Sequence, residues 1–141
     1  MAVVAGHHLV IPNQSPTVTF EWELYGPEFT LTPLPAGKVS LVVLTIAIAD
    51  NPGSPAHVFL RTELDTGGGW SDGMDGEATV GLWPVPAPGG PVNVERATLT
   101  ASHGRVVTPS GPVKVRALFR QDYGTPVRYR SGRHVWWIVP V

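Results

Sequence analysis

Apolar and polar side chains alternate along much of the chain, with the period of two that predicts β-strands. Over 17–24 the apolar residues fall on one side and Thr or Glu on the other, which indicates a half-buried strand. Over 38–49 both alternating sets are almost wholly apolar, so this strand needs cover on both faces. Further strands are predicted at 3–11, 57–64, 92–102, 112–120, 126–130 and 134–141. Short strands could also form at 77–83 and 105–108, and a short extended piece lies around Phe29 and Leu31.

Turn residues separate these strands at intervals of about 8–12 residues. His103-Gly104 predicts a turn, Ser131-Gly132 predicts a hairpin, and the proline-rich stretch 84–91 predicts an extended crossover. The pattern therefore predicts an all-β protein. We expect a single domain over 1–141, an antiparallel β-sandwich or jelly-roll-like fold of roughly eight or nine strands.

Composition supports strands and excludes several kinds of chemistry. The 16 glycines and 15 prolines disfavour long helices, and the 43% of hydrophobic residues excludes disorder throughout the chain. There is no cysteine, which excludes disulfides, thiolate metal sites and cysteine nucleophiles. The longest apolar run, 41–49, is about half as long as a membrane span, and the N-terminus lacks the pattern of a secretory signal. A soluble protein that does not bind membranes is expected.

Charge is divided unevenly along the chain. Residues 1–95 carry ten acids against two bases, a net charge of −8, whereas residues 96–141 carry eight bases against one acid, a net charge of +7. The two halves could pair inside one sandwich, or the basic face of one chain could meet the acidic face of the next. Nucleic-acid binding by the basic half is not expected, because no nucleic-acid module is recognisable.

A second strand, 134–139, also needs cover on both faces. Trp136 and Trp137 are adjacent, so their side chains point to opposite sides and only one can enter the core. The other could be covered by the loop 65–76, by the stretch 84–91, by a neighbouring subunit or by a sugar that stacks on it, or it could remain exposed. Candidate interface residues are the apolar and arginine side chains typical of binding hot spots: Val42, Leu44, Ile46, Arg116, Arg120, Arg128, Arg130, Trp136, Trp137 and Ile138.

No catalytic or cofactor motif stands out. None of the five histidines is followed two residues later by Asp or Glu. Asp65, Asp72, Asp75 and Glu77 lie in or beside one glycine-rich loop, but their spacing does not match a calcium loop. We expect no cofactor, no metal and no catalytic residue.

Taken together, these strands carry a family resemblance. The cysteine-free strands rich in Val, Thr, Gly and Pro, the segments 41–48 and 134–139, and the preference for arginine resemble small virion proteins of tailed phages that infect GC-rich hosts. Those all-β proteins decorate capsids or form minor parts of tails. The resemblance implies symmetric, non-enzymatic assembly on a particle, often as trimers, and localisation in a virion assembled in the host cytoplasm.

The sequence therefore predicts a structural interaction protein that forms a homo-oligomer, plausibly a trimer, on a larger assembly such as a capsid or tail. It would assemble through apolar strand faces and charge complementarity. One alternative is a carbohydrate-binding module that stacks sugars on Trp70 and Trp83, close to the glycine-rich loop. Another is a jelly-roll enzyme, although the metal triad typical of such enzymes is missing from the sequence.

Overall fold

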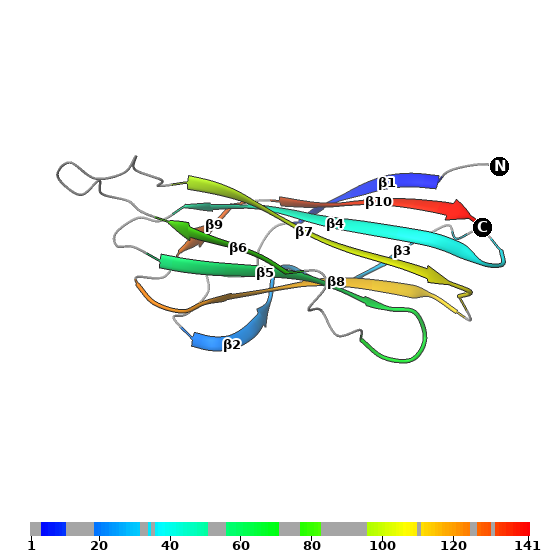
Figure 1. The fold of residues 1–141 in the computed structure, drawn as a ribbon, viewed down its shortest axis with the longest axis horizontal. Coiled ribbons are helices and arrows are strands. Elements are labelled where there is room, and N and C mark those ends of the chain that lie inside the picture. The colour runs from blue at the N-terminus through cyan, green and yellow to red at the C-terminus, as the bar shows by residue number, and fades with distance from the viewer. Residues whose placement is uncertain are drawn as a thin grey trace.

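Two antiparallel sheets face each other as a β-sandwich in a computed structural model of the chain (Figure 1). The structure describes residues 4–10, 19–31, 34, 36–50, 56–70, 77–82, 96–109, 111–124, 127–130 and 132–141. These residues form ten strands, so the expectation of an antiparallel sandwich is confirmed. The predicted crossover at 84–91 lies outside the described residues.

Sheet A is built around the long strand β4 (Val39–Asp50), which the doubly apolar segment 38–49 predicted closely. Its strand order is β1-β10-β4-β7, and the short strand β9 also pairs with β4. Because β1 and β10 run antiparallel, the start of β1 and the end of β10 lie at the same end of the sandwich (Figure 1). The other strands of sheet A are β1 (Val4–Val10), β7 (Arg96–Val107), β9 (Arg128–Tyr129) and β10 (Gly132–Pro140).

Sheet B is built around β8, which lies between β2 and β5. Its order is β2-β8-β5-β6, and the short strand β3 also pairs with β8. The strands of sheet B are β2 (Thr19–Leu24), β3 (Phe29–Leu31), β5 (Ala56–Asp65), β6 (Glu77–Leu82) and β8 (Val113–Gln121).

The turn predicted at His103-Gly104 is wrong. β7 continues through both residues and pairs with β4 along all twelve of its positions. His103 points into the sandwich and is buried, while Gly104 lies opposite Val42. Pairing with the long strand β4 thus keeps His103 and Gly104 in an extended conformation.

The hairpin predicted at Ser131-Gly132 is also wrong. β9 and β10 both run antiparallel to β4 and pair with the same side of it, one after the other. The chain therefore does not reverse direction between them. Gly132 is required there for a different reason. A Cβ atom at this position would collide with the carbonyl oxygen of Ile46 and would lie 2.8 Å from the hydroxyl of Tyr25.

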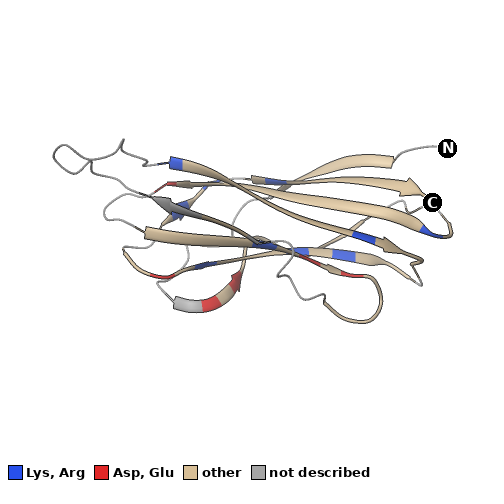
Figure 2. Cartoon of the chain, viewed as in Figure 1, with Lys and Arg blue, Asp and Glu red and all other residues tan. Residues whose placement is uncertain are grey.

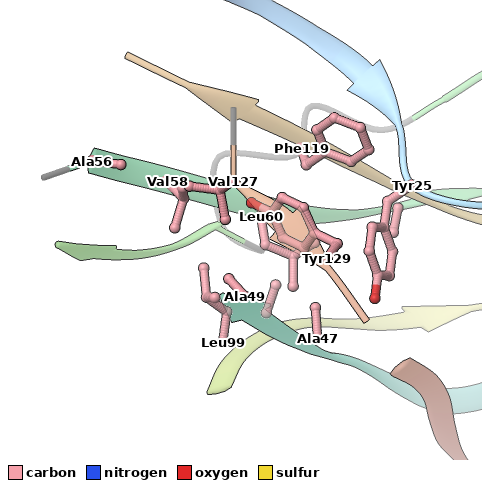
Figure 3. Packing of buried hydrophobic residues seen from close by; sticks show 12 residues of the cluster. Tyr25, Ala47, Ala49, Ala56, Val58, Leu60, Leu99, Phe119, Val127 and Tyr129 are labelled. Atoms are coloured by element: carbon pink, nitrogen blue, oxygen red, sulfur yellow. The ribbon is translucent and has the colours of Figure 1, made fainter. Parts of the chain in front are cut away.

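Two hydrophobic clusters fill the space between the sheets. In the first, the rings of Tyr25, Phe119 and Tyr129 lie together with Leu60 from sheet B and Ala49 from sheet A (Figure 3). The Tyr25 hydroxyl donates a hydrogen bond to the Arg130 carbonyl oxygen at 2.9 Å. Burial raises the pKa of the Tyr25 phenol, so it remains a hydrogen-bond donor at any physiological pH.

The second cluster lies toward the end of the sandwich where β1 begins and β10 ends. It contains Leu31, Leu41, Leu64 and Ile138, with Trp136 packed against it. Between the two clusters lies a buried polar layer, because Thr45 interrupts the apolar inward positions of β4 and Thr62 interrupts those of β5. The core is therefore two apolar compartments separated by hydrogen-bonded side chains.

Candidate assembly surface

The outer face of sheet A, which points away from sheet B, is largely apolar across three adjacent strands. In β4 the buried side chains alternate with Val42, Leu44, Ile46 and Ile48, which point outward. Strand pairing continues this face onto β10 and β1, and onto one end of β7. We call the set the apolar patch: Ala5, Leu9, Val42, Leu44, Ile46, Ile48, Val106, Val135, Trp137 and Val139.

Trp137 occupies the middle of the patch. It lies opposite Ala5 on β1 and Val42 on β4, two of its cross-strand neighbours. Its side chain is 41% exposed and that of Val42 is 36% exposed. A partly exposed tryptophan framed by aliphatic side chains is the composition found at the centre of protein interfaces.

The patch has a polar boundary on one side. The outward positions of β7 carry Thr98, Thr100 and Ser102, all exposed, and these residues lie opposite the aliphatic positions of β4. Two polar side chains lie within the patch: Arg133 is exposed between Leu9 and Ile46, and His7 is exposed between Ala5 and Leu9. An apolar centre with a polar rim is the usual anatomy of an interface.

A groove of about 230 Å³ opens at the end of the patch nearest β9. It is lined by Leu9, Ile46, Ile48, Gly132 and Arg133. Leu9, Ile46 and Ile48 supply its aliphatic walls, and Arg133 supplies a cationic group. The groove can accept an apolar side chain of a partner, and the guanidinium group of Arg133 lies at its margin.

The structure divides the predicted interface residues among four places. Val42, Leu44, Ile46 and Trp137 come together in the apolar patch, whereas Trp136 and Ile138 point inward. Ile138 is only 1% exposed, and Trp136 packs against Phe29 with ring centroids 5.5 Å apart. The four arginines lie elsewhere: Arg116 and Arg120 on the outer face of sheet B, and Arg128 and Arg130 in and beside β9.

Sequence reasoning missed several members of the patch. Leu9, Val135 and Val139 were not singled out, although their spacing could have shown them. Val135, Trp137 and Val139 alternate along one strand and so must share a face. Leu9 is 57% exposed and joins the patch only through the pairing of β1 with β10, which no local pattern indicates.

The outer face of sheet B carries tryptophans stacked with arginines. The guanidinium carbons of Arg61 and Arg120 lie 4.6 and 5.0 Å from the Trp22 ring centroid. The Arg116 guanidinium lies 4.3 Å from the ring of Trp70, the candidate sugar platform. Trp70 thus already has a stacking partner within the chain, and Trp83 lies outside the described residues.

Opposite charges from the two halves of the sequence meet inside one chain. Arg116 binds the Glu63 carboxylate at 2.6 Å, and both Arg96 and Arg130 bind Asp50. Figure 2 shows basic positions in both layers and the acidic β2 at the margin of sheet B. Because β8 lies between β2 and β5, the fold itself interleaves the acidic and basic segments. Pairing within one sandwich accounts for these contacts.

Asp50 shows how strong this internal pairing is. Burial by itself would raise the pKa of the carboxyl group, but hydrogen bonds from Arg130 and Arg96 outweigh that effect. The net result is an Asp50 pKa below its usual range. Its charge is therefore already balanced within the chain, at the end of the sandwich where β9 lies.

The glycine-rich loop closes on one of its own acids. The Asp65 carboxylate accepts hydrogen bonds from the backbone N–H groups of Gly67 and Gly69, at 2.9 and 3.1 Å. Asp72 and Asp75 lie outside the described residues. Among the residues that the structure describes, no group of three potential metal-ligating side chains occurs. The described part of this loop lies beside sheet B and does not cover the apolar patch.

No family model matches the chain, and no curated protein matches its sequence. Within the described residues, no helix is long and apolar enough to cross a bilayer.

Proposed function

We propose that this protein is a non-enzymatic structural component of a virion, a capsid decoration or tail protein. It assembles by burying the apolar patch between its own subunits. The observation that carries the proposal is the outer face of sheet A, where Trp137 lies at the centre of an apolar surface spanning three strands. What supports the virion assignment is the resemblance in strand composition.

The energetics of the patch favour a partner. Every 100 Å² of apolar surface removed from water contributes about 2.5 kcal/mol before the costs of association. Contiguous apolar surfaces of this kind are rare on monomers, because they favour uncontrolled association. A second sheet packed face to face on the patch would be the usual β-sandwich arrangement, with facing side chains interdigitated.

The surroundings of the two tryptophans favour assembly over sugar binding. Trp70 already stacks on Arg116, whereas Trp137 stands in an aliphatic frame on the opposite side of the molecule. We therefore favour assembly over the carbohydrate-binding alternative. Charge complementarity between chains has less support than apolar burial, since Arg96, Arg116 and Arg130 pair internally.

The experiment is the solution mass of the wild-type chain and of a Trp137→Glu variant, measured by light scattering. A buried carboxylate in the middle of the patch would oppose association, so we expect the wild type to be the heavier species. Thr100→Glu is the matched control, since it places the same charge on the same face in the polar rim. Equal masses for the wild type and Trp137→Glu, with both proteins folded by circular dichroism, would overturn the proposal.

A further inference from the structure

β1 is a regular strand at the margin of sheet A. Its seven residues pair with β10 without interruption, from Val4 opposite Ile138 to Val10 opposite Gly132. Within the described chain, β10 is the only strand that pairs with β1 (Figure 1). Among the described residues, no strand pairs with the backbone groups on the other side of β1.

Edge strands usually carry features that prevent such pairing: charged side chains, prolines, bulges or very short length. β1 contains no proline and no Lys, Arg, Asp or Glu, and its register has no bulge. The other described edge strands of at least six residues are all charged, with Glu21 and Glu23 in β2, Glu77 in β6, and Arg96 and Arg105 in β7.

Aromatic rings pack against the inward side of β1. The ring of Trp136 lies across Gly6, and a Cβ atom at Gly6 would be 2.5 Å from that ring. His8 stacks on Phe29 with ring centroids 4.7 Å apart, which fixes the next inward position. Trp136 and Phe29 thus fix the position of β1 from the inward side of the sheet.

We propose that the β1 edge pairs with the β1 edge of a second copy of this chain, antiparallel and around a two-fold axis. An antiparallel pair of identical strands is self-complementary, as a two-fold interface requires. Side chains that face each other across strands must lie on the same side of the sheet. The register that pairs all seven residues is therefore centred on His7.

This register joins the apolar patches of the two chains. Along most of β7 the patch ends at threonine and serine side chains, but on the β1 side it reaches the strand edge at Leu9. In the proposed pair, Leu9 faces Ala5 of the second copy, and the two outer faces point to the same side. The inference deepens the proposed function and rests on its premise that the chain assembles, but it assigns self-pairing to a different surface.

The test uses the Trp137→Glu variant, in which association through the apolar patch is suppressed. We expect this variant to be a dimer, with twice the mass of the 15.1 kDa chain, when its mass is measured by sedimentation equilibrium. Adding His7→Asp or His7→Lys places like charges opposite each other, and each double variant is expected to be a monomer. His7 is exposed, so neither substitution disturbs the core.

Mixing the two double variants tests the two-fold register itself. The aspartate of one chain would then face the lysine of the other, so a mixture of His7→Asp and His7→Lys chains is expected to regain the dimer mass. Matched controls are Thr100→Asp and Thr100→Lys in the same background, which charge the other edge strand of sheet A and should leave the dimer intact.

Three results would overturn the inference: a monomeric Trp137→Glu variant, a dimer that survives charging His7, or a mixture that stays monomeric. Hydrogen exchange of the wild type gives an independent measurement, since the β1 amides should lose protection on dilution if the strand pairs. Failure of the proposed function looks different, because it leaves the wild type and Trp137→Glu with equal masses.

Discussion

His134 is a titratable side chain enclosed in the polar layer of the core. Its Nδ1 atom lies 2.8 Å from the Thr45 hydroxyl oxygen, which lies 2.6 Å from the hydroxyl of Thr62. Its Nε2 atom is buried without a hydrogen-bond partner among the described residues. Burial, and secondarily the charge of His8, lower the pKa of His134 from 6.5 to about 4. The folded protein therefore holds this imidazole neutral.

This lowered pKa makes stability depend on pH. Between pH 6.5 and about 4 the unfolded chain binds a proton at residue 134 that the folded chain does not, so stability falls as the pH falls. We expect a loss on the order of 3 kcal/mol over this window, measured by urea unfolding at a series of pH values.

The His134→Gln variant is the control for that measurement, because its amide can still reach Thr45 but does not titrate. Its unfolding free energy should fall less steeply than that of the wild type between pH 6.5 and 4. Parallel pH profiles for the two proteins would contradict the assignment to His134. Asp50 does not disturb this comparison. Its pKa is lowered in the folded protein, so its contribution to the pH dependence of stability falls at more acidic pH than that of His134.

The two adjacent tryptophans show the limit of residue-scale prediction. Their alternation predicted that one would point inward and one outward, and this is what the strand does. Which one enters the core depends on space made by other strands: Gly6 on β1 leaves room for the Trp136 ring, and Phe29 on β3 packs against it. Those neighbours are more than 100 residues away in the sequence.

At the scale of elements, β8 is tied to β5 by a partly buried ion pair. The Arg116 guanidinium binds Glu63 at 2.6 Å and also stacks on Trp70. The Glu63 side chain is only 7% exposed, and its other basic neighbour, Arg61, is 3.8 Å away. Glu63 therefore depends on Arg116 for the compensation of its charge.

Replacing Arg116 by alanine should leave the Glu63 carboxylate poorly compensated. We expect a loss of roughly 1–3 kcal/mol in the free energy of unfolding, measured by denaturant titration. Lys114→Ala, at an exposed outward position of the same strand, should change stability by less than about 0.5 kcal/mol. Similar losses for both variants would contradict a specific role for the Arg116–Glu63 pair.

Elements were predicted best where the pattern was longest. The doubly apolar segment 38–49 matches β4 within about one residue at each end, because hydrophobic periodicity over many positions outweighs any single residue. The errors fell on single dipeptides. The turn signal of His103-Gly104 was overridden by pairing with β4 along the whole of β7. The turn signal of Ser131-Gly132 was overridden because β9 and β10 both pair with the same side of β4.

For the molecule as a whole, the fold places the acidic and basic segments beside each other. Asp50 is held by Arg96 and Arg130, which come from the basic part of the sequence. Because these acidic and basic side chains already pair within one chain, fewer of them are available for ion pairs between chains. Assembly through the apolar patch should consequently behave as hydrophobic association.

The wild-type mass should therefore be the same at low and high salt. Screening weakens exposed ion pairs between chains, but it does not weaken burial of apolar surface. Light scattering across a salt series measures this directly, with the Trp137→Glu variant as the reference for loss of patch contacts. Dissociation of the wild type at high salt would instead favour acid-to-base contact between chains.

The sequence by itself determined the class of fold and the presence of surplus apolar surface. Both follow from local alternation, since a strand that is apolar on two sides needs two covers wherever it lies. Only the tertiary structure decided where that surface is: strand order placed β10 between β1 and β4 and aligned Leu9, Trp137 and Val42 on one outer face. It also brought the −8 and +7 segments together, because pairing between distant strands is settled by the packing of the whole sandwich.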